Sequence, residues 1–114
     1  MKLLEAISIL DINNRWLLKS VIKVLEVKLD HLNYLEPHYE EELYRQWEER
    51  YEYLENALDA FYKALLLLGT LETSREQIPA DNIRKNVRNA INEGVLCLEH
   101  CQNEFGGLNR INVY

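Results

Sequence analysis

The sequence predicts an all-α fold, an elongated antiparallel helical bundle of three principal helices plus a short N-terminal helix. Leu, Glu, Ala, Lys and Arg are plentiful, while only four Gly and two Pro occur in 114 residues. This composition favours helices over a sheet that needs many tight turns. Apolar residues also recur at alternating steps of three and four over long stretches. Residues that break or end helices separate these stretches, at Pro37, Gly69 and Gly106-Gly107.

A short leading helix and a first long helix are expected before Pro37. The leading helix has helically spaced apolar residues: Leu3, Leu4, Ile7 and Leu10. Residues 11–14 prefer caps and turns, so the next helix should begin near Arg15. Its apolar seam consists of Leu18, Ile22, Leu25, Leu29 and Leu32. Because a proline disfavours helical geometry in the residue before it, this helix should end near Leu35.

The longest periodic signal runs from about Pro37 to Gly69. Pro37 suits the first turn of a helix, and Gly69 supplies a C-cap. The seam between them consists of Tyr44, Trp47, Tyr51, Leu54, Leu58, Phe61, Leu65 and Leu68. Such a helix spans about 50 Å, which exceeds the diameter of a compact domain of this size. It should therefore overhang the bundle, or another segment should pack along its end.

The last helix is expected between Asp81 and Gly106-Gly107, after a connecting segment from Gly69. Thr73 and Glu76 have the spacing of a capping box, which predicts a single helical turn within that connection. The seam of the last helix contains small residues, namely Ala90, Gly94, Cys97 and Cys101. Small residues allow a neighbouring helix to approach closely. The chain is thus predicted to be one domain over residues 1–114, which oligomerisation could complete.

Composition restricts the classes of function. A formal net charge of −6 repels a phosphate backbone, which disfavours a protein that coats nucleic acid. No apolar run reaches the length of a membrane span or a signal-peptide core, so a cytoplasmic protein is expected. Cys97 and Cys101 lie one helical turn apart, where a disulfide is geometrically awkward. Reduced thiols are therefore expected.

The most site-like cluster is Cys97, His100 and Cys101. These residue types at this spacing can supply three ligands to zinc, with His31 or His38 as candidates for a fourth. In the competing interpretation both cysteines are small core residues, and His100 lies on the side of the helix that faces water. Structural zinc sites usually combine ligand pairs from separate segments, so the second interpretation is favoured. No metal and no cofactor are expected.

Three classes of helical enzyme are disfavoured. Di-iron carboxylate proteins need Glu-x-x-His pairs, and no glutamate stands three residues before any histidine here. Glu49, Glu52 and Glu55 resemble one half of the carboxylate pattern of helical nucleotide pyrophosphohydrolases, but no second acidic pair follows. Ribonucleases of the HEPN type carry an arginine at a fixed spacing before a histidine, which is missing here. The chain is predicted not to be an enzyme.

The most probable function from the sequence is protein binding, as a small adaptor, inhibitor or assembly subunit. The first half of the long helix is aromatic and acidic, and aromatic residues are enriched at interfaces. The candidate partner-binding residues are Tyr44, Trp47, Tyr51, Glu48 and Glu52. The partner would be another protein or a second copy in a homodimer. Alternatively, these aromatic residues cap the core opposite Trp16 and the leading helix.

A different class of function rests on the basic start of the last helix. Arg84, Lys85 and Arg88 lie close together there, interleaved with asparagines, which leaves a site for nucleic acid or an anionic ligand open. The competing interpretation is that they pair with glutamates across the bundle. Cations near the start of a helix oppose its dipole, so Arg84 and Lys85 should have an anionic neighbour.

Overall fold

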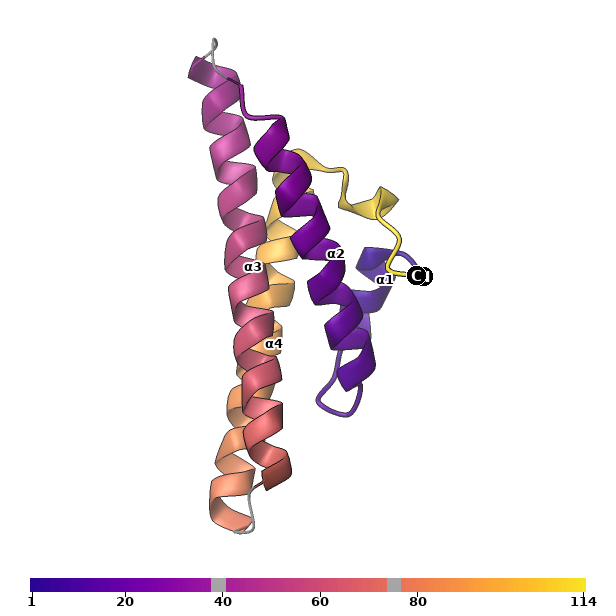
Figure 1. Cartoon of the computed structure of the whole chain (residues 1–114), viewed down its shortest axis with the longest axis vertical. Coiled ribbons are helices and arrows are strands. Elements are labelled where there is room, and N and C mark those ends of the chain that lie inside the picture. The colour runs from indigo at the N-terminus through magenta and orange to yellow at the C-terminus, as the bar shows by residue number, and fades with distance from the viewer. Residues whose placement is uncertain (38–40, 74–76) are drawn as a thin grey trace.

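The computed structural model describes residues 1–37, 41–73 and 77–114 and shows an all-helical bundle (Figure 1). Within these residues there are four α-helices, followed by a 3-10 turn over Leu108–Arg110. The α-helices are α1 over Leu3–Ser8, α2 over Arg15–Tyr34, α3 over Glu41–Thr73 and α4 over Gln77–Phe105. The molecule measures 55 × 25 × 21 Å. The predicted fold class, three principal helices plus a short leading one, is confirmed.

The boundaries of α2 follow the predicted signals. The side chain of Asn14 accepts a hydrogen bond of 3.1 Å from the backbone N–H of Leu17, which caps the start of the helix. At the other end the backbone N–H of Leu35 donates to the carbonyl of Leu32 at 3.0 Å. Pro37 lies outside any helix, and the residues that follow it, 38–40, lie outside the described part of the chain. The prediction that Pro37 occupies the first turn of the long helix is therefore wrong.

α3 and α4 run antiparallel along most of their length, and α2 packs over one side of this pair (Figure 1), so that one core forms between the three helices. Phe61 of α3 is fully buried against Gly94 of α4. A Cβ atom at Gly94 would lie only 2.4 Å from a ring carbon of Phe61. The close approach expected from the small residues of the last helix is thus confirmed at Gly94.

The connection predicted between Gly69 and Asp81 is largely helical. α3 continues through Gly69 to Thr73, and α4 is already helical at Gln77. Leu68 is buried and Leu71 packs against the core, and this packing outweighs the cost of about 1 kcal/mol for a glycine inside a helix. Gly69 is therefore not a C-cap. The predicted capping box of Thr73 and Glu76 includes Glu76, which lies outside the described residues.

The segment after α4 was not anticipated from the sequence. Gly106 and Gly107 have positive φ angles of 72° and 88°, which end the helix and turn the chain. The side chain of Gln102 then accepts a hydrogen bond of 2.8 Å from the backbone N–H of Leu108, whose side chain is buried. From there the chain crosses to the N-terminal residues, where Lys2 and Asn112 form an isolated antiparallel bridge.

Candidate functional site

The register between α3 and α4 follows from two contacts. Gly94 faces the ring of Phe61, and the guanidinium carbon of Arg50 lies 5.2 Å from the ring centre of Phe105. Phe61 and Arg50 are eleven residues apart on α3, and their partners Gly94 and Phe105 are eleven residues apart on α4. The two helices therefore stay in antiparallel register over this length. Leu43 comes seven residues before Arg50, so it lies about 10 Å beyond the level of Phe105, at 1.5 Å per residue. Since α4 ends at Phe105, α3 overhangs it, which is one of the two outcomes expected from its length.

Two leucines are exposed near the end of α2 and the start of α3. Leu43 belongs to the same side of α3 as Phe61, because eighteen residues make five whole turns, yet it is 48% exposed. Leu35, directly after α2, is 56% exposed. The end of α2 and the start of α3 lie together beyond the last turn of α4 (Figure 1). We use one name, the open end, for Leu35 at the end of α2, Leu43 at the start of α3, and the contact of Arg50 with Phe105.

The aromatic residues of α3 form a ladder beside the open end. The ring of Trp47 lies 5.6 Å from that of Tyr44 and 5.3 Å from that of Tyr51. The indole N–H of Trp47 donates to the carbonyl of Leu32 at 2.7 Å, as a second hydrogen bond to an oxygen that also accepts from the N–H of Leu35. Trp47 and Tyr51 are half-buried in this packing, and Tyr44 is 39% exposed.

This ladder changes both interpretations of the aromatic half. It packs against the end of α2, not opposite Trp16, which lies at the other end of α2 and contacts the ring of Tyr114 at 5.0 Å. That part of the prediction is wrong, because the short connection after α2 places the two aromatic groups at opposite ends of that helix. Trp47 and Tyr51 are partly used inside the chain, so Tyr44 is the ring of this ladder that is most available to a partner.

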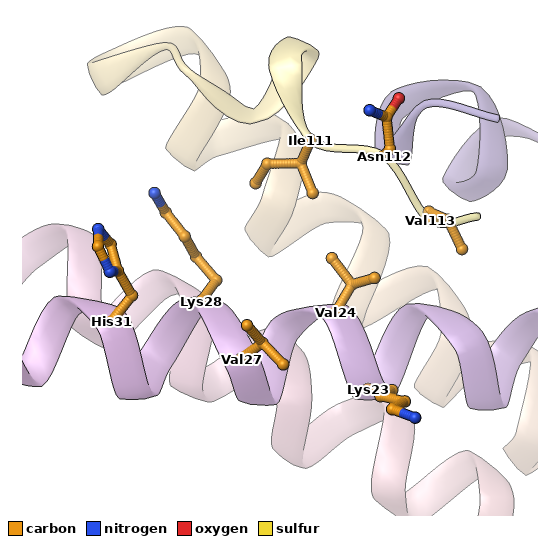
Figure 2. Close-up of a pocket in the computed structure, with 8 residues that line it drawn as sticks. All are labelled: Lys23, Val24, Val27, Lys28, His31, Ile111, Asn112 and Val113. Carbon is orange, nitrogen blue, oxygen red and sulfur yellow. The ribbon is translucent and has the colours of Figure 1, made fainter.

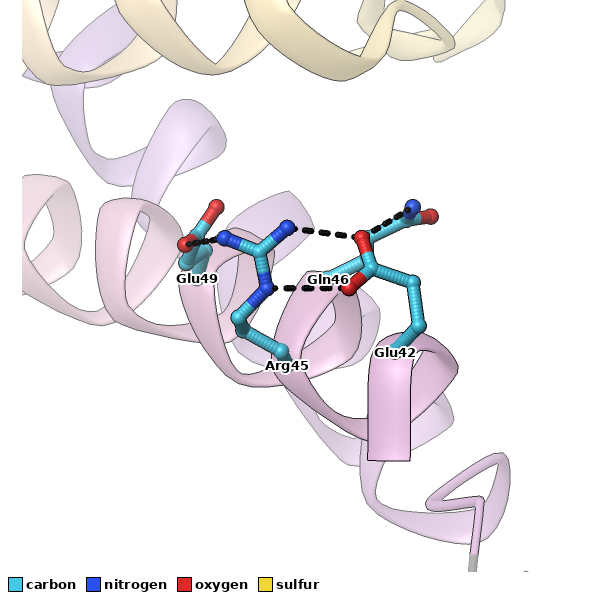
Figure 3. A network of polar contacts seen from close by, with 4 residues as sticks. All are labelled: Glu42, Arg45, Gln46 and Glu49. Atoms are coloured by element: carbon cyan, nitrogen blue, oxygen red, sulfur yellow. Dashed lines mark hydrogen bonds and ion pairs between the residues drawn. The ribbon is translucent and has the colours of Figure 1, made fainter. Parts of the chain in front are cut away.

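The acidic residues of the overhang are partly neutralised along the helix. Figure 3 shows Arg45 between two glutamates, with Nη2 2.6 Å from Glu42 Oε1 and Nη1 3.5 Å from Glu49 Oε1. Hydrogen bonds from Arg45 and Gln46 hold the pKa of Glu42 below its ordinary value. Three further glutamates are exposed and form no ion pair within the described residues: Glu41 and Glu48 of the overhang, and Glu52 just past Arg50. The overhang therefore keeps a negative surface.

The basic residues of the alternative site lie on α4. Arg84 pairs with Asp81 of the same helix at 2.9 Å, which supplies the anionic neighbour that it was expected to have. Lys85 and Arg88 are exposed. Since α4 already includes Gln77, these cations do not stand in its first turn as the sequence predicted. One basic residue does reach across the bundle, because Arg15 of α2 pairs with Glu72 of α3.

The cysteine cluster is divided between the core and the surface. Cys101 is fully buried, and burial raises the pKa of its thiol to about 11. Cys97 is half-buried, whereas His100 is exposed beside the ring of Tyr53. Across residues 1–37, 41–73 and 77–114, no three His, Cys, Asp or Glu side chains are placed to hold a metal ion. His31 lies exposed on α2, and His38 is outside the described residues.

The sequence did not single out Leu35 and Leu43. Their spacing resembles that of core residues, and the signal that could have identified them was the unequal length of the two long helices rather than any motif.

Comparison of the chain with protein-family models, with curated proteins and with solved structures finds no match. Among the described helices, none combines the length and apolar composition needed to cross a bilayer.

Proposed function

We propose that the protein is a non-catalytic protein-binding module whose open end receives an amphipathic helix of its partner. The observation that carries the proposal is the apolar seam of α3, which continues past the last turn of α4 and leaves Leu43 half exposed. A helix placed beyond Phe105 would continue the packing that α4 begins. This is the helix-in-groove mode of peptide recognition.

The expected gain comes mainly from the two leucines of the open end. Each is about half exposed, so its complete burial contributes on the order of 1 kcal/mol. Tyr44 adds an exposed aromatic ring at the edge of the same region. Aromatic and aliphatic anchors of this kind dominate the energetics of many interfaces. The open end thus offers a small apolar surface with a defined neighbour, the end of α4.

Charge selects the kind of partner. The overhang carries the exposed glutamates Glu41 and Glu48, with Glu52 just past it. The arginine of the overhang, Arg45, is already paired with Glu42 and Glu49. Complementary charge speeds association and disfavours partners of the wrong sign. The proposed partner therefore presents an apolar stripe flanked by Lys or Arg. An adaptor, an inhibitor and an assembly subunit would all use such a surface.

The test uses a synthetic amphipathic helix made of leucine and lysine as the probe. Calorimetry should detect its binding to the wild-type protein, with at least about tenfold weaker binding to Leu35→Ser/Leu43→Ser. Leu66→Ser is the matched control, because Leu66 is 75% exposed on the same helix but far from the open end. A peptide in which glutamate replaces lysine should bind more weakly, and salt should weaken the lysine peptide.

Equal affinity for wild type and the double variant would exclude the open end as the binding surface. Sedimentation equilibrium of the protein alone decides whether a second copy takes the partner's place. Self-association that Leu43→Ser abolishes and Leu66→Ser preserves would identify the partner as a second copy.

A further inference from the structure

A concave surface lies between the outer face of α2 and the C-terminal segment (Figure 2). It is a groove of about 520 Å³, within the range of ligand-binding pockets. Its lining residues come from two separate parts of the chain: Lys23, Val24, Val27, Lys28 and His31 from α2, and Ile111, Asn112 and Val113 from the C-terminal segment. Figure 2 shows Val24 and Lys28 pointing from α2 toward that segment.

The charge of this groove is opposite to that of the protein. Lys23 and Lys28 line the groove, and none of the described side chains that line it is a carboxylate. The ammonium of Lys28 points toward the C-terminal segment, whereas that of Lys23 points away from it along α2 (Figure 2). The whole chain carries a formal net charge of −6. The nearby Glu26 of α2 does not line the groove, and its carboxylate accepts a hydrogen bond from Tyr62 of α3. An apolar floor with a cationic rim selects a ligand that is both apolar and anionic.

The C-terminal segment contributes an unpaired backbone edge. The carbonyl of Ile111 accepts from the N–H of Leu3, and the N–H of Val113 donates to the carbonyl of Met1, both at 2.8 Å. In an extended chain, neighbouring residues direct their backbone groups to opposite edges. The N–H and C=O of Asn112 therefore point away from the N-terminal residues, and they form no hydrogen bond within the described residues.

We propose that this groove binds an extended acidic peptide, which adds as a strand along residues 111–113. The backbone groups of Asn112 would pair with the peptide backbone, as in other cases of strand addition. Its apolar side chains would contact Val24 and Val27, and its carboxylates would pair with Lys23 and Lys28. A helical ligand satisfies its backbone internally and would leave Asn112 unused.

This binding site is independent of the proposed function. The open end is acidic and made by α3, α4 and the end of α2, whereas the groove is basic and shares no residue with it. Loss of either activity would leave the other intact. A protein with both surfaces can hold a basic helix and an acidic peptide together.

The probe for the groove is a capped synthetic peptide of alternating glutamate and valine. Titration of ¹⁵N-labelled protein should shift the amide signals of residues 111–113, and hydrogen exchange at the Asn112 amide should slow. Lys23→Glu/Lys28→Glu should weaken binding at least about tenfold. Lys19→Glu/Lys63→Glu changes the net charge equally with exposed lysines outside the groove, and it should retain most of the affinity.

A backbone variant tests the strand itself. Asn112→Pro removes an N–H that donates no hydrogen bond within the described chain, and Ile111 already has the extended geometry that precedes proline, with φ −83° and ψ 130°. Binding should weaken about fivefold for the loss of one hydrogen bond, with an unchanged circular dichroism spectrum.

Three outcomes would overturn the proposal. One is equal affinity of the wild type and Lys23→Glu/Lys28→Glu. Another is peptide binding without slower exchange at Asn112, which would indicate a different mode of recognition. The third is lysine-dependent binding of decanoate while the peptide fails to bind, which would assign the groove to a small amphiphilic anion.

Discussion

Phe61 and Leu43 lie on the same side of α3 but have different surroundings. Phe61 is fully buried against Gly94, and Leu43, five turns earlier, is 48% exposed because α4 has already ended. The apolar period of the sequence is the same at both positions. The comparison shows that a seam defines which face of a helix can be buried, whereas the length and register of the neighbour decide how much of it is buried.

The largest expected effect is the contrast between truncations at these two positions. Phe61→Ala should lower the free energy of unfolding by about 3–5 kcal/mol, because it removes a fully buried ring and leaves a cavity. Leu43→Ala should lower it by no more than about 1 kcal/mol, because only about half of this side chain is buried. Urea denaturation measures both. A loss above about 1 kcal/mol for Leu43→Ala would mean that the open end is already covered, and the comparison would fail.

Gly94→Ala tests how tightly α4 approaches α3. The new Cβ would lie 2.4–2.8 Å from three ring carbons of Phe61, and such overpacking costs about 1–3 kcal/mol. Gly69→Ala is the matched control, since nothing lies within 4 Å of its Cβ position. Relief of the helix propensity penalty should make that variant about 0.5–1 kcal/mol more stable.

A second variant keeps the Gly94 prediction decisive. Adding Phe61→Leu to Gly94→Ala removes the ring from the clash, so the double variant should lose less than the sum of the two single losses. Additive losses in thermal or urea unfolding would show that the ring of Phe61 does not limit the approach of the helices.

The smallest expected effect concerns the attachment of α2 to the overhang. Trp47→Phe keeps an aromatic ring but removes the indole N–H that bonds to the Leu32 carbonyl, so it should cost about 1 kcal/mol. Trp16→Phe is the control, because Trp16 is exposed and its indole forms no hydrogen bond in the described part of the chain. Equal stability of the two variants in urea would show that the Trp47 bond does not stabilise the end of α2.

The helices and much of the core could be predicted from the sequence. The seams of α2, α3 and α4 are strong periodic signals, and Asn14 and Gly106-Gly107 act as the predicted boundaries. Gly69 misled the prediction, because packing of Leu68 and Leu71 carries α3 past a residue that ends many helices. The helix-propensity cost of a glycine is about 1 kcal/mol, and the burial of neighbouring leucines outweighs it.

The candidate site could be predicted only in part. An overhang was one of two outcomes expected from the length of the seam, and Tyr44 and Glu48 are exposed there, with Glu52 exposed just past it. Trp47 and Tyr51 instead contribute to the packing against α2, because the carbonyl of Leu32 lies within hydrogen-bonding distance of the indole. The groove beside Lys23 and Lys28 had no sequence signal, since its two walls are separated by about eighty residues of chain.

The sequence by itself determined the helical class, the order of the helices and the face that each one can bury. These are local properties, since backbone preference and the period of 3.6 residues depend on neighbours along the chain. Tertiary structure alone decided that α4 stops beside Arg50, that Leu43 stays exposed and that residues 111–113 lie across α2. Burial depends on which distant segment arrives at a surface, and periodicity carries no information about that neighbour.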